Sequence, residues 1–94
     1  MAPERPEQMQ DAEEVGFSGL LLMLGTAALA HLGAAPDPAK GEAKLDLAQA
    51  KQAIDLLDVL KVKTAGNLTG AESGMLDDLL FDLRMRYLDA VKRA

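Results

Sequence analysis

The 94-residue sequence contains no cysteine and no tryptophan, and only one tyrosine and two phenylalanines. Without cysteine the chain can form neither a disulfide framework nor a thiolate metal site. Because no thiol requires an oxidising compartment, a cytoplasmic location is expected. The few aromatic side chains leave little surface for stacking on bases, and a net charge of -5 opposes binding to phosphate backbones. Nucleic acid is therefore not an expected partner.

Charge is distributed unevenly along the chain. Residues 1–14 carry five acidic side chains against a single arginine, together with two prolines and no apolar periodicity. Such a segment does not bury enough apolar surface to offset the entropy of ordering it. We therefore expect a disordered acidic leader over residues 1–14, followed by a single helical domain over residues 15–94. The leader is acidic, whereas the start of a secretory signal is basic.

The most apolar part of the sequence, residues 15–36, contains no Asp, Glu, Lys or Arg. It predicts a helix over residues 17–32, with Ser18 as a possible N-cap and Gly33 as the residue that ends it. Apolar residues point in every direction around this helix, which is typical of a helix buried on all sides. His31 is the single histidine, and we expect it to pack near the helix end rather than to act as a base or ligand.

A second helix is predicted over residues 47–65. Apolar residues recur there at helical spacing while charged residues occupy the opposite side. Asp46 is placed to cap its N-terminus, and Gly66 is placed to end it. Lysines near its C-terminal end are favourable for the helix dipole.

A third helix is predicted over residues 70–92, where Thr69 and Glu72 match the capping-box pattern. Its main apolar stripe is accompanied by a second apolar line on the flank, formed by Phe81, Met85 and Leu88. The sequence thus predicts an all-α, three-helix domain in which helices two and three form an antiparallel hairpin.

This pattern leaves more apolar surface than a small three-helix monomer can cover, which favours a homodimer or higher oligomer. The interface is expected on the first helix and on the flank of the third, at Leu20, Leu24, Ala28, Phe81, Met85 and Leu88. A different protein is also an admissible partner. The alternative is a membrane-associated protein, because residues 15–36 are long enough to cross a bilayer. Their many glycines and alanines reduce the hydrophobicity of that segment and make the membrane the weaker interpretation.

No catalytic, cofactor-binding or metal-binding pattern is visible. The lone histidine has no second ligand at a metal-site spacing, and no serine or threonine lies within a recognisable triad. We therefore expect a non-enzymatic protein that needs no cofactor. Asn67, Arg84 and Arg86 form a possible anion or ion-pair site, of which the structural ion pair is the favoured form. A small-ligand or anion-binding protein is the remaining alternative.

Several stretches resemble a bacterial family known as domain of unknown function 1844. The most specific are Lys63-Thr64-Ala65-Gly66-Asn67-Leu68-Thr69 and Leu83-Arg84-Met85-Arg86-Tyr87. The resemblance covers about residues 17–88 and departs from the family at Ala65, Gly70, Ser73 and Gly74. It implies a small, helical, cytoplasmic bacterial protein, and it implies no activity because the family has none assigned.

Overall fold

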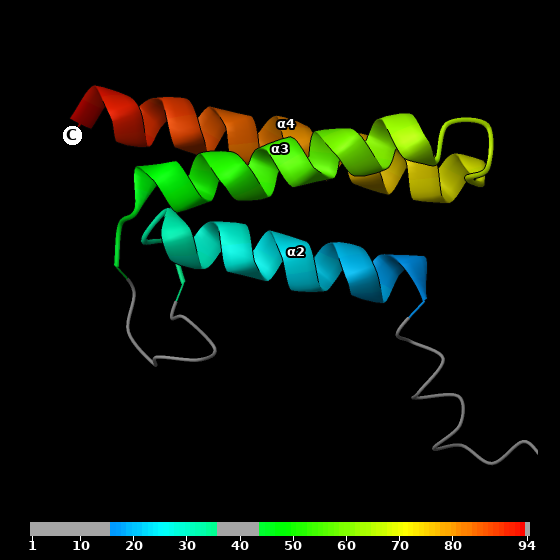
Figure 1. The fold of residues 1–94 in the computed structure, drawn as a ribbon, viewed down its shortest axis with the longest axis horizontal. Coiled ribbons are helices and arrows are strands. Elements are labelled where there is room, and N and C mark those ends of the chain that lie inside the picture. The colour runs from blue at the N-terminus through cyan, green and yellow to red at the C-terminus, as the bar shows by residue number, and fades with distance from the viewer. Residues whose placement is uncertain (1–15, 36–43, 94) are drawn as a thin grey trace, which may run out of the picture.

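The computed structural model describes residues 16–35 and 44–93, which form three helices (Figure 1). These are α2 (Phe17–His31), α3 (Leu47–Lys63) and α4 (Gly70–Arg93). The predicted all-α, three-helix class is confirmed, and α3 and α4 form the predicted antiparallel hairpin beside α2. The leader predicted over residues 1–14 lies outside the described residues.

Helix α2 begins at Phe17 as predicted, but its N-cap lies two residues before the predicted one. Its N-cap is Gly16, with no side-chain capping hydrogen bond, so the assignment of Ser18 as N-cap is wrong. Ser18 lies inside the first turn because Phe17 is already helical. At the other end Gly33 adopts a φ of 76°, the left-handed conformation expected of a glycine that follows a helix. His31 lies in the last turn and is half-buried.

Helix α3 is capped as predicted: the Asp46 side chain accepts a hydrogen bond from the Gln49 backbone N–H at 3.1 Å. The helix ends at Lys63, two residues before the predicted end. Thr64 leaves helical geometry while its hydroxyl donates to the Leu60 carbonyl at 2.8 Å. The reversal is completed at Gly66, where φ is 83°.

The capping box of α4 is formed in both directions. The Glu72 backbone N–H donates to Thr69 Oγ1 at 3.1 Å, and the Thr69 N–H donates to Glu72 Oε1 at 2.9 Å. These two bonds satisfy donors that the start of a helix leaves without an intrahelical partner. They fix the beginning of α4 despite the two glycines in its first turns.

Replacing Gly74 by alanine is expected to raise the free energy of unfolding by about 0.5–1 kcal/mol. Gly74 lies inside α4, and a Cβ at this position would meet no atom within 4 Å. Alanine would therefore favour the helical conformation more than glycine does, and its methyl group would not clash with a neighbouring atom. Thermal unfolding followed by circular dichroism measures the change, and an unchanged or lower melting temperature would contradict the expectation.

Leucines from all three helices meet in one core together with small residues that allow close approach. Its members are Leu21, Ala28, Leu32, Ala50, Ala53, Ile54, Leu57, Leu76, Leu80 and Leu83. Gly25 brings α2 close to α4, because a Cβ there would stand only 3.0 Å from the Leu79 side chain. The core thus depends on small residues in α2 as much as on leucines in α3 and α4.

Helix α2 is not buried on all sides, contrary to the prediction from its composition. Leu22 is 71% exposed and Met23 is 62% exposed. Two neighbouring helices can cover only part of the circumference of a third, so one side of α2 remains uncovered. Within residues 16–35 and 44–93, no helix combines the length and apolar character needed to cross a lipid bilayer.

Backbone contacts join the end of α2 to the residues that precede α3. Leu32 and Leu45 form an isolated antiparallel β-bridge, and the Asp46 N–H donates to the His31 carbonyl at 2.6 Å. This junction ties the end of α2 to the start of α3 and sets their relative position.

Candidate protein interface

The outward side of α4 carries an apolar line formed by Phe81, Met85 and Leu88, here termed the outer stripe. Their exposed fractions are 68%, 54% and 54%. Met85 is nine residues from the buried Leu76, which places it about 180° around the helix from the core. The outer stripe therefore cannot be covered by α2 or α3. Within residues 16–35 and 44–93 no side chain buries it, so this surface is open to contact by another molecule.

Helix α3 extends this surface beyond α4. Val62 is 72% exposed, and it lies one turn after Asp58, which forms an ion pair with Arg84 of α4. Phe81 lies three residues before Arg84. Because the two helices are antiparallel, Val62 and Phe81 are both displaced from that ion pair toward the same end of the hairpin. Exposed apolar side chains thus occur on both helices of the hairpin, Val62 on α3 and Phe81 on α4.

Ion pairs join α3 to α4 along this surface. Arg84 pairs with Asp58, and the Lys61 Nζ lies 2.8 Å from Asp77 Oδ1. All four side chains are about half exposed, so each pair contributes about 1 kcal/mol or less. Their main effect is to fix how the two helices lie against each other.

A further exposed pair lies on α3 itself. The Lys51 ammonium donates to Asp55 at 2.8 Å. This hydrogen bond, followed by the charge of the same carboxylate, raises the pKa of Lys51 above its ordinary value. The pair sits beside a shallow hollow that Leu56 and Val59 line on the outside of α3.

The structure divides the predicted interface residues between two environments. Phe81, Met85 and Leu88 are exposed, whereas Ala28 is completely buried among the three helices. Leu20 and Leu24 are half-buried, and Leu24 packs against the core. Ala28 is therefore a core residue of the single chain and cannot contact a partner.

Asn67, Arg84 and Arg86 do not converge on one site. Asn67 lies in the turn before α4, about 20 Å along the helix axis from Arg84. Arg86 lies about 200° around α4 from Arg84, and its Nε donates to Asp82 at 2.9 Å. In the single chain each arginine is part of a separate ion pair.

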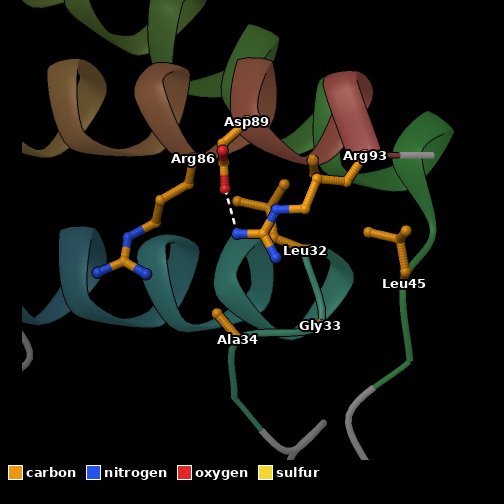
Figure 2. A pocket seen from close by; sticks show the side chains of 8 residues that line it. Leu32, Gly33, Ala34, Leu45, Arg86, Asp89 and Arg93 are labelled. Atoms are coloured by element: carbon orange, nitrogen blue, oxygen red, sulfur yellow. Dashed lines mark hydrogen bonds and ion pairs between the residues drawn. The ribbon is translucent and has the colours of Figure 1, made fainter.

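Arg86 lines a hollow of about 480 Å³ where the ends of α2 and α4 lie close together. Figure 2 shows Arg86 and Arg93 extending from α4 toward α2, with Arg93 bonded to Asp89. Leu32 and Leu45 supply the apolar part of the wall. Both guanidinium groups are already engaged by carboxylates of α4, Arg86 by Asp82 and Arg93 by Asp89. Sequence reasoning had not singled out Arg93, although its spacing from Asp89 is that of a helical ion pair.

No cluster of three His, Asp or Glu side chains able to hold a metal ion occurs within residues 16–35 and 44–93. Ionisable side chains in this part of the chain are also absent from the buried core. The chemical groups that distinguish the surface are thus apolar side chains and exposed ion pairs.

Comparison with protein families identifies a family whose model matches most of the chain. The family described as "Domain of unknown function (DUF1844)" matches residues 14–89, in agreement with the resemblance seen in the sequence. No curated protein and no solved structure matches the chain.

Proposed function

Because the chain belongs to this family of unknown function, we propose from its surface that it is a non-enzymatic homo-oligomeric protein that acts through protein–protein contacts. The observation that supports the proposal most directly is the outer stripe. Phe81, Met85 and Leu88 follow one another at helical spacing, each is more than half exposed, and all three point away from the core.

The size of the surface supports a contact that uses both helices of the hairpin. A helix of 24 residues is about 36 Å long and roughly 10 Å wide, so α4 alone offers roughly 360 Å². A standard stable interface buries about 800 Å² on each partner. The outward side of α3, a helix of 17 residues that carries Val59 and Val62, adds roughly 250 Å², so the two helices together offer about three quarters of that value.

The proposal also includes the cellular location of the protein. We place the protein in the cytoplasm, because a chain without cysteine gains nothing from an oxidising compartment. A second copy of the chain is the proposed partner, and contact with a different protein would use the same outward surface.

Replacing Met85 by aspartate is expected to dissociate the oligomer, with a loss of affinity of about 100-fold or more. The substitution removes apolar surface from the contact and places an unpaired carboxylate in it, once in each copy. Light scattering after size exclusion measures the mass in solution. Because Met85 is exposed in the single chain, the variant should retain the helical circular dichroism spectrum of the original.

Met23→Asp is the matched control, since Met23 is also exposed but lies on α2, away from the outer stripe. This variant should keep the mass of the original protein. A monomeric original protein would refute the proposed oligomer. Dissociation by Met23→Asp but not by Met85→Asp would move the contact to α2 and would contradict the assignment to the outer stripe.

A further inference from the structure

The charged residues of α4 are almost all paired within the single chain. Glu72 belongs to the capping box. The other charged residues of α4 that form ion pairs do so as Asp77 with Lys61, Arg84 with Asp58, Asp82 with Arg86, and Asp89 with Arg93. Two charges of the helix remain. Within the described residues Asp78 and Lys92 take part in no salt bridge.

These two charges lie in line with the outer stripe. Asp78 precedes Met85 by seven residues and Lys92 follows it by seven. Since seven residues make almost two complete turns, all three side chains leave the helix in nearly the same direction. Phe81 and Leu88 are also seven residues apart and lie between them. The outward side of α4 is thus an apolar line with an acidic end and a basic end.

We propose that a second copy of this chain docks on the outer stripe with its α4 antiparallel, related by a two-fold axis near Met85. This inference rests on the proposed homo-oligomer and specifies its geometry. In the antiparallel arrangement Asp78 meets Lys92 of the partner subunit, and the same pair forms again at the other end of the contact. Along the helix axis, Phe81 of each copy then lies at nearly the same position as the partner's Leu88.

The parallel arrangement is disfavoured by the same charges. It would bring Asp78 against the partner's Asp78 and Lys92 against the partner's Lys92, so like charges would meet at both ends of the contact. Asp82 and Asp89 lie at the edge of the same surface, but each already holds an arginine of its own helix, so they add little repulsion. Only the antiparallel arrangement pairs the two remaining charges of α4 with opposite charges.

Cysteine cross-linking tests the orientation directly, because the natural chain contains no cysteine. Residues 78 and 92 are separated by about 21 Å along α4. A disulfide requires Cα atoms less than about 7 Å apart. In the antiparallel dimer Asp78→Cys therefore should not link to itself, and neither should Lys92→Cys. A mixture of the two variants should give a cross-linked dimer, and Met85→Cys should link to itself near the two-fold axis.

The outcomes separate the orientation from the proposed function. A dimeric protein in which Asp78→Cys or Lys92→Cys links to itself would overturn the antiparallel arrangement while leaving the oligomer intact. A dimer that gives no link in the mixture would also overturn it. If light scattering shows the natural chain to be a monomer, the proposed function itself fails.

Charge reversal supplies a second measurement that does not require oxidation. Asp78→Lys alone and Lys92→Asp alone should each weaken the dimer by about tenfold, because two attractive contacts become repulsive. The doubly reversed variant should return to nearly the original affinity, since it restores both pairs with exchanged signs. Failure of the double reversal to restore affinity would contradict the pairing, and equal circular dichroism spectra would show that all three variants are folded.

Discussion

Replacing Leu80 by alanine is expected to lower the free energy of unfolding by about 2–5 kcal/mol. Leu80 is 1% exposed and lies among leucines of all three helices. The substitution removes three buried carbons and leaves a cavity that the surrounding helices fill only in part. In a domain of this size each kcal/mol corresponds to about 4–8 °C in melting temperature, so a decrease of at least about 8 °C is expected.

The control for this variant is Leu22→Ala, which makes the same chemical change at a leucine that is 71% exposed. It should alter the free energy of unfolding by about 0.5 kcal/mol or less. Both variants should be compared at one protein concentration, since association adds a concentration-dependent contribution to stability. Equal losses at the two positions would contradict the placement of the core.

Replacing Gly25 by leucine should destabilise the fold by about 1–3 kcal/mol or more. Even a Cβ at this position stands 3.0 Å from Cδ1 of Leu79, and the rest of the leucine side chain would extend into occupied space. Leucine is a better helix former than glycine by up to about 1 kcal/mol, but the overpacking outweighs that gain. Helix α2 would have to move away from α4, which a denaturant titration would detect as a lower midpoint.

A second substitution identifies the cause of this loss. Leu79→Ala removes the side chain that Gly25→Leu would strike, so the double variant should be more stable than the sum of the two single effects implies. Independent, additive effects would show that the clash between these two positions is not the source of the loss. Gly74→Ala, which meets no neighbouring atom, gives the effect of replacing a helical glycine without a clash.

The helices of this fold could be predicted because their ends are set by local chemistry. Asp46 caps α3 through its own side chain, and Thr69 and Glu72 cap α4 through each other. These contacts join residues three apart in the sequence, so the sequence alone displays them. Ser18 is also of a residue type that favours N-caps, but it does not cap α2, because the helix has already begun at Phe17.

The orientation of α2 could not be predicted, since an apolar helix offers no polar side to place toward water. Ala28 is buried and Leu22 is exposed, the reverse of what side-chain size alone would favour. The cause is the close approach of α2 to its neighbours, which requires small residues at the contact. Composition indicates that small residues are present but not which of them face the neighbouring helices.

The outer stripe was predictable in part. The spacing of Phe81, Met85 and Leu88 places them on one side of a helix, and the structure shows that this side faces outward. The pairing of the surrounding charges was not predictable, because the partner of Arg84 is Asp58, 26 positions away. Only when such distant pairs are known do Asp78 and Lys92 stand out as the charges without a partner among the described residues.

The bridge between Leu32 and Leu45 makes the segment between them a suitable place to graft a foreign peptide. The bridge holds the two backbones about 5 Å apart, so the end of α2 and the start of α3 keep their positions through their own contacts. Each doubling in the length of a closed loop costs only about 0.6 kcal/mol. An epitope or reporter inserted between Ala35 and Lys44 would leave both the leucine core and the outer stripe in place.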